Sequence, residues 1–399
     1  IRDRARDSVC GQFQWIYSSH DNPGRRQPDE AYRKIDKVGP FNYKGLVTPW
    51  EEPLDVYYMY RANYVPAAKD PMVYLVSHTW ANRFEKGRRR ATIEAYSNCD
   101  SVLLYNDLTN EKATFLGRKK NNGTGTHFMW ENRDIRYNVL RAVGYYKGKP
   151  VAEDLILLNG LEQAPNFELL YQDDKKILKG EAGYNYLYRL NCGGDDYTDS
   201  FGQLWLQDNT NYSRSWAENF KDLNPYLASQ RTTNDPIHGT RDWTLFQHFR
   251  FGRHQLEYRF PVADGTYRIE LYFTEPWHGT GGSASADCEG LRIFDVAVND
   301  SVVLDDLDIW AESGHDGVCK KVVYAIVKGG MLKIHFPEVK AGQALISGIA
   351  IASTDQELKP TVFPASGWSW EKADKEVMEK TPKELLPEDK NARVSICLL

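Results

Sequence analysis

The sequence lacks several features that would assign it quickly to a class of protein. Its nine histidines and six cysteines are dispersed among 399 residues, and neither set has the CxxC, HExxH or paired spacing of a zinc site. We therefore expect no metal and no cofactor. No apolar run approaches the about 18 residues that a membrane-spanning helix requires, so we expect no membrane span. The first residues also lack the pattern of a signal peptide.

An excess of charge of one sign is also missing. Lysine and arginine number 50, aspartate and glutamate number 55, and the two signs are interspersed to give a net charge of −5. A nucleic-acid-binding surface requires a basic stripe or patch, so we expect no nucleic-acid partner. Aromatic residues are abundant instead, with 11 tryptophans and 24 tyrosines. They can fill several hydrophobic cores and leave some rings for stacking on sugars.

The six cysteines stand at positions 10, 99, 192, 288, 319 and 397. Their spacing defines no disulfide framework. Two interpretations stay open. Cys288 and Cys319 can pair with each other, or the thiols can be free and buried, which we favour for most of the six.

A hairpin signal in residues 291–314 (LRIFDVAVNDSVVLDDLDIWAESG) is the clearest local pattern. Phe294, Val296 and Val298 alternate with polar or small residues, as on one face of a β-strand. Asn299-Asp300 is a two-residue turn signal, and residues 302–304 begin a second apolar run. The pattern predicts an antiparallel β-hairpin. The aspartates at 305, 306 and 308 that follow lack EF-hand spacing, so we interpret them as turn residues rather than a calcium site.

This hairpin resembles one in the malectin family of carbohydrate-binding β-sandwiches, and other motifs follow in the order of that family. They are LNCGG at 190–194, DSFG at 199–202, WLQD at 205–208, GTYR at 265–268, LYFTE at 271–275 and LISGIAI at 345–351. The resemblance implies a malectin-like β-sandwich over residues 184–354. It also implies a carbohydrate ligand.

In that family, aromatic side chains on loops at one end of the sandwich contact the sugar. Carried over by motif, these positions fall on Trp216, Phe251 and Trp277. For Phe251 we favour packing in the core, whereas the polar, Gly- or Ser-flanked surroundings of the two tryptophans favour exposure. The late acidic contact of the family falls near Gly342 and is absent here.

Residues 1–66 resemble the last β/α unit of the catalytic barrel of glycoside hydrolase family 2, the β-galactosidase type. The matching stretches are GQFQW at 11–15 and GLVTPWEEPLDVYYMYRANY at 45–64, and residues 53–63 have helical spacing. Trp15 matches an aromatic that lines the sugar subsite. The two catalytic glutamates of the family lie on earlier strands, so we expect no catalytic residue in this chain. We interpret Glu51 and Glu52 as acidic residues at the start of a helix, where they interact favourably with the helix dipole.

Residues 70–160 have strand-like segments separated by turn clusters. SNCDSVLLYND at 97–107 and VLRAVGYYKGKPV at 139–151 resemble the immunoglobulin-like sandwich that follows the barrel in family 2 enzymes. For His78 and Trp80 we favour a structural role, with Trp80 as an alternative aromatic near the sugar cleft. Residues 161–183 read as a linker. Residues 355–399 are a charged, partly helical segment with helical composition at 370–380.

The sequence therefore predicts a mainly β protein, with two antiparallel sandwiches after a remnant of a (β/α)8 barrel. The resemblance implies the C-terminal portion of a bacterial, periplasmic or secreted glycoside hydrolase. It would act on β-linked oligosaccharides or polysaccharides by a retaining mechanism, with its two carboxylates outside this chain. The remainder of the barrel is then an expected partner. The alternative is a non-catalytic carbohydrate-binding or scaffolding module.

Overall fold

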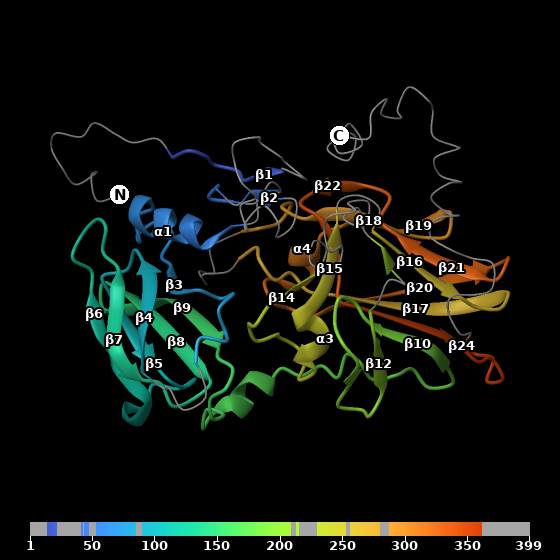
Figure 1. Cartoon of the computed structure of the whole chain (residues 1–399), viewed down its shortest axis with the longest axis horizontal. Helices are drawn as coiled ribbons and strands as arrows, with labels where there is room; N and C mark the ends of the chain where they lie inside the picture. Colours follow the sequence, from blue (N-terminus) through green and yellow to red (C-terminus); the bar gives the residue numbers. More distant parts are fainter. Residues whose placement is uncertain are drawn as a thin grey trace, which may run out of the picture.

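A computed structural model describes residues 14–21, 41–42, 44–47, 53–84, 90–208, 213–214, 230–252, 256–279 and 287–360. The fold is mainly β, as predicted, and it contains two antiparallel sandwiches that lie side by side (Figure 1). No helix in these ranges is long and apolar enough to cross a membrane. Glu51-Glu52 and the predicted helix at 370–380 lie outside the described residues.

The first sandwich packs a three-stranded sheet against a four-stranded sheet. In spatial order, the sheets are β3 (Val73–Val76), β4 (Arg90–Ser97) and β7 (Phe128–Asp134), and β6 (Phe115–Lys120), β5 (Ser101–Tyr105), β8 (Val139–Tyr146) and β9 (Lys149–Leu157). A short 3-10 helix, η3 (Lys112–Thr114), precedes β6. Alternation along β4 buries Ile93 and Ala95 completely. The indole of Trp130 is also fully buried, and its Nε1 donates to the Gly117 carbonyl at 3.0 Å. The indole N–H of Trp130 therefore has a hydrogen-bond partner inside the core.

Helix α1 (Asp55–Tyr64), which the sequence predicted, packs on the first sandwich. The Tyr58 ring stacks on Tyr74 of β3 with a centroid distance of 4.0 Å, and the Tyr74 hydroxyl donates to Asp55 at 2.6 Å. The helix thus buries Tyr58 against the three-stranded sheet of the first sandwich. Before it, β1 (His20–Asp21) pairs with β2 (Phe41–Asn42). Packing of residues 1–66 against a barrel remains a prediction.

The second sandwich has two main sheets and a smaller one. The first main sheet is β11 (Tyr197–Thr198), β12 (Leu204–Gln207), β10 (Asn185–Asn191), β24 (Gly348–Ser353), β17 (Gly265–Phe273) and β20 (Cys319–Val327). The second is β13 (Ser213–Arg214), β16 (Glu257–Pro261), β21 (Met331–His335), β18 (Ile293–Val298) and β19 (Ser301–Leu307), with β22 (Val339–Ala341) beside β18. The third is β14 (Gln230–Thr232), β15 (His248–Gly252) and β23 (Ala344–Ile346). Side chains from all three sheets form one hydrophobic core.

The predicted hairpin is β18 and β19. Val298 pairs with Ser301, so the turn is the predicted Asn299-Asp300, and Asn299 has a φ of 52°. A positive φ at an Asn is the backbone state that such a turn requires. The apolar face predicted from the alternation is buried in the core. The opposite face is covered as well, because Asp295 lies only 6% exposed and accepts a hydrogen bond from the Asp306 backbone at 2.9 Å.

The first and last strands of this sandwich are neighbours. β10 and β24 run antiparallel, with Asn185 opposite Ser353 at one end and Asn191 opposite Gly348 at the other. The Asn185 amide then donates to the carbonyls of Asp355 (3.2 Å) and Leu358 (2.8 Å). The chain therefore enters and leaves the sandwich at the same place.

Residues 161–183, read from the sequence as a linker, pack between the two sandwiches. They contain a 3-10 helix, η4 (Phe167–Tyr171), and Phe167 and Leu178 are buried. Both belong to an apolar cluster with Val139 of the first sandwich and Trp243 of α3 (Trp243–Gln247) in the second. The segment thus fills an interface as well as connecting two modules.

Cys99, Cys192, Cys288 and Cys319 are all buried free thiols. The option of a Cys288–Cys319 disulfide was therefore wrong. Burial raises the pKa of the Cys288 and Cys319 thiols to about 11, so both are protonated at neutral pH. Cys10 and Cys397 lie outside the described residues.

Candidate functional site

A buried ion pair organises the end of the second sandwich where β17 stops. The Arg292 guanidinium pairs with the Glu275 carboxylate, and neither side chain is exposed to solvent. Glu275 also accepts the backbone N–H groups of Trp277 (3.0 Å) and His278 (3.1 Å), while Arg292 donates to the Gln343 carbonyl at 2.7 Å. Burial alone would raise the pKa of Glu275, but Arg292 and these hydrogen bonds lower it to about 2.

The ion pair fixes the indole of Trp277. The Arg292 guanidinium lies 5.4 Å from the centre of the Trp277 ring, within the range of a cation–π contact. The indole also meets Phe249 and Phe251 edge to face, at centroid distances of 5.1 and 5.8 Å. Trp277 is therefore half-buried, whereas its polar surroundings in the sequence had favoured exposure.

The other predicted sugar-contacting residues have different environments. Phe251 is only 3% exposed and belongs to the sandwich core, in agreement with the packing role that we favoured. Trp15 is 80% exposed and Trp80 is 59% exposed, and the latter lies in the first sandwich with the Arg83 guanidinium 5.1 Å from its ring. Trp216 lies outside the described residues. Of the four positions that the structure describes, only Phe251 and Trp277 lie together.

The missing acidic contact at Gly342 has a structural reason. Gly342 has a φ of 61°, and a Cβ added there would lie 2.9 Å from the Leu291 carbonyl oxygen. A side chain at this position would therefore be strained and would collide with backbone. This glycine lets residues 341–343 pass close to the backbone of Leu291 and Arg292.

A second group of polar residues lies where the two sandwiches meet. His78, from the first sandwich, has its Nε2 2.9 Å from Asp154 of β9 and its Nδ1 2.6 Å from Asp235 of the second sandwich. Burial alone would lower the pKa of His78, but the two carboxylates raise it well above its usual value. A protonated His78 therefore bridges the two modules with charge-assisted hydrogen bonds.

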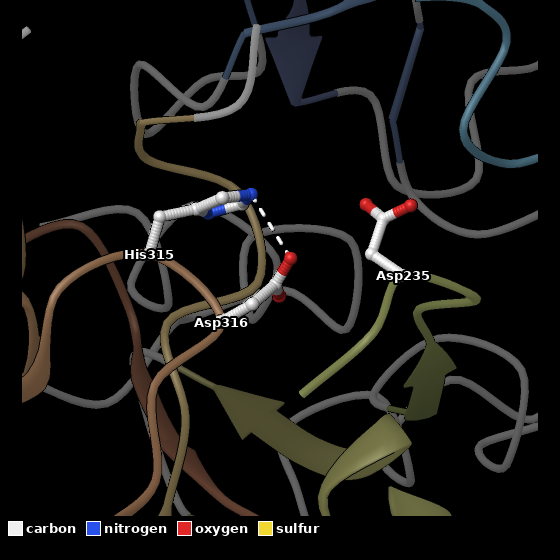
Figure 2. A group of neighbouring side chains, drawn as sticks. All are labelled: Asp235, His315 and Asp316. Carbon is white, nitrogen blue, oxygen red and sulfur yellow. Dashed lines mark ion pairs between the residues drawn. The ribbon is translucent and has the colours of Figure 1, made fainter. Parts of the chain in front are cut away.

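Asp235 also faces His315 and Asp316, which belong to the second sandwich as well (Figure 2). The Nε2 of His315 lies 3.0 Å from Asp316 Oδ2, and the ligand atoms of the three residues all lie within 4.8 Å of one another. Burial raises the pKa of Asp316 to about 6 despite the nearby imidazole. Burial alone would lower the pKa of His315, but Asp316 raises it to about 9. The three side chains are of the types that bind transition-metal ions.

The sequence analysis identified neither of these groups. Arg292, just before β18, pairs with Glu275, just after β17, and Asp235 meets His315 and Asp316 only through the folding of distant loops. No local spacing marks such contacts. The one available signal was the unusual pair His315-Asp316 directly after the predicted hairpin and the short helix α4 (Ile309–Ser313).

Comparisons with known proteins agree with the malectin resemblance. A family model described as Malectin domain matches residues 186–357. Malectin from Danio rerio is 25% identical over 166 residues, which are 40% of this chain and 52% of that protein. Residues 186–357 therefore form a malectin domain.

The chain is also similar to proteins described as β-glucuronidases. A Formosa agariphila protein described as a β-glucuronidase is 28% identical over 158 residues, which are 38% of this chain and 17% of that protein. The solved structure of Bacteroides uniformis β-glucuronidase aligns over 81% of this chain and 34% of that chain, with 23% identity and a TM-score of 0.33. The matched segments thus span about half of malectin and a smaller part of the β-glucuronidases.

Proposed function

We propose that this chain is the C-terminal portion of a glycoside hydrolase that acts on β-linked glycosides, and that its malectin domain binds carbohydrate. The observation that carries the proposal is a malectin domain in a chain that is also similar in sequence to a protein described as a β-glucuronidase. The hydrolase is proposed to use a retaining mechanism with two carboxylates about 5–5.5 Å apart. We place these glutamates outside this chain, on earlier strands of a barrel whose last unit is residues 1–66. The periplasm or the exterior of a bacterium is the proposed location.

The substrate class is the part of this proposal that an assay can settle first. The sequence motifs resembled the β-galactosidase type, whereas two similar proteins are described as β-glucuronidases. A chromogenic β-glucuronide and β-galactoside are therefore offered separately to this 399-residue chain and to the protein that the complete gene encodes. We expect turnover of one of them by the complete protein and none by this chain. Turnover by this chain that survives Glu51→Gln and Glu52→Gln would overturn the assignment of catalysis to residues elsewhere.

The alternative is a non-catalytic carbohydrate-binding or scaffolding module, and one observation favours its scaffolding form. Phe251, a position carried over from malectin as a ligand contact, is buried in the core, and Trp277 is held on one side by Arg292. A domain altered in this way serves as a spacer between other modules. Absence of activity from the complete protein, together with absence of glycan binding, would support this alternative.

A further inference from the structure

The three residues at the junction come from two loops that backbone hydrogen bonds hold in place. The Asp316 N–H donates to the Glu275 carbonyl at 2.9 Å, and its own carbonyl accepts from the His238 N–H at 2.8 Å. Asp316 has a φ of 52°, a state that non-glycine residues adopt uncommonly. The Asp235 carbonyl accepts from Gln247 Nε2 at 2.9 Å. Both carboxylates are therefore fixed in position before any ligand arrives.

Each carboxylate keeps one oxygen without a hydrogen-bond partner among the described residues. Asp235 Oδ2 contacts His78 and Asp316 Oδ2 contacts His315, whereas Asp235 Oδ1 and Asp316 Oδ1 have none. The side chains are only 5% and 6% exposed, respectively. A buried polar atom left unsatisfied costs on the order of 1–3 kcal/mol, so such atoms call for a ligand. Two of them in one cluster, on residues of the same charge, indicate a cation.

The geometry points to a site for a divalent transition-metal ion, bound by Asp235, His315 and Asp316 at the junction of the two sandwiches. One imidazole and two carboxylates suit Zn2+ or Mn2+ better than Ca2+, which prefers oxygen ligands alone. Three protein ligands leave a position open for water or a further side chain. His78 orients Asp235 from the first sandwich, which is the usual arrangement behind a metal ligand. All three ligands belong to the second sandwich, and His78 connects the site to the first.

A second acidic group makes a matched control. Asp295, Asp305 and Asp306 also bring carboxylates within 4.8 Å of one another, but Asp305 and Asp306 are exposed. Asp306 is already paired with Lys340, and Asp295 accepts the Asp306 N–H. These carboxylates are solvated or satisfied, so we expect no transition-metal site there.

The 399-residue chain is treated with a chelator, exchanged into buffer, and titrated separately with Zn2+, Mn2+ and Ca2+ by calorimetry. We expect saturable binding of about one Zn2+ or Mn2+ per chain and weaker binding of Ca2+. Co2+ then reports the ligand set by its visible absorption. Asp316→Asn and His315→Ala should each weaken binding at least about 100-fold, and His78→Asn about 10-fold to 100-fold. The control Asp306→Asn should bind as the parent chain does.

Two results would overturn the site. One is the absence of saturable Zn2+ or Mn2+ binding by the parent chain, which needs no variant. The other is binding that Asp316→Asn and His315→Ala leave unchanged while far-ultraviolet circular dichroism shows both folded. Preferential Ca2+ binding that Asp306→Asn abolishes would assign the ion to the other group instead. None of these outcomes depends on glycosidase activity.

Discussion

Arg292 and Glu275 form an ion pair in which neither side chain has any solvent-exposed surface. Replacing Glu275 with Gln leaves the guanidinium charge buried without its counter-ion, although the shape is conserved. We expect a loss of about 3 kcal/mol or more in the free energy of unfolding, because breaking a buried pair on one side is strongly destabilising. Denaturant unfolding at pH 7 measures this loss. The double variant Glu275→Gln, Arg292→Met should recover part of it. A fully stable single variant would contradict the expectation.

The same pair predicts how stability depends on pH. The pKa of Glu275 falls from 4.5 in the unfolded chain to about 2 in the folded domain. The pair therefore contributes its full stabilisation above about pH 4.5, and this contribution is lost as the pH falls towards 2. The shift corresponds to about 3 kcal/mol. The free energy of unfolding, measured between about pH 6 and about pH 2 where carboxylates titrate, should depend less steeply on pH in Glu275→Gln than in the parent chain.

The bridge through His78 predicts a change in how the two sandwiches are coupled. His78→Ala leaves Asp154 and Asp235 buried without their shared hydrogen-bond donor. We therefore expect the free energy of unfolding to fall by about 3 kcal/mol. His78→Asn is the matched control, because its amide can donate to one of the carboxylates. Calorimetry in the presence of a chelator should show the modules unfolding in better-separated steps in His78→Ala. Identical melting of the parent and His78→Ala would show that the bridge does not couple them.

Replacement of Trp277 should weaken glycan binding if its indole contacts the sugar. Removal of an aromatic anchor typically costs about 1–3 kcal/mol, so Trp277→Ala should weaken glycan binding by that amount. Because the indole also packs on Phe249 and Phe251, thermal melting must be measured alongside binding. Tyr324→Ala is the control, since this exposed aromatic side chain of β20 is not among the positions assigned to the sugar. Unchanged binding in a folded Trp277→Ala would favour the spacer function.

Because the described cysteines are free thiols, we expect the stability of the chain not to depend on a reductant. Cys99, Cys192, Cys288 and Cys319 are buried, so a chain with Cys10→Ser and Cys397→Ser should react with a thiol reagent only after unfolding. Dithiothreitol should not change its melting temperature. A fall in melting temperature on reduction would indicate a disulfide after all.

The parts of the fold that were predictable are those that local physics determines. Helix α1 follows from its spacing and from Pro53, and the β18–β19 hairpin follows from alternation around Asn299-Asp300. The malectin sandwich followed from motifs spread over much of the chain. Environments that depend on distant residues were harder to predict. Polar neighbours in the sequence suggested that Trp277 is exposed, but Arg292 and Phe249 reach it through the tertiary structure.

The candidate metal site was not predictable for the same reason. Asp235 and His315 belong to separate loops, and neither lies in a recognisable ligand motif. The packing of residues 161–183 between the two sandwiches was also not predicted. The polar composition of residues 161–183 indicated a linker, although Phe167 and Leu178 supply apolar contacts to both sandwiches.

The pairing of β10 with β24 gives the malectin domain a property that concerns its evolution rather than its ligand. Its two ends lie together, because Asn185 of β10 stands opposite Ser353 of β24 in the first main sheet. A domain with adjacent ends can be inserted into a loop of an unrelated protein without disrupting the fold of that protein. Such a domain also tolerates circular permutation. Joining residues 185 and 358 by a short linker and opening the chain at the Asn299-Asp300 turn should therefore yield a folded domain. Adjacent ends of this kind allow such a domain to be one module of proteins that otherwise differ in construction.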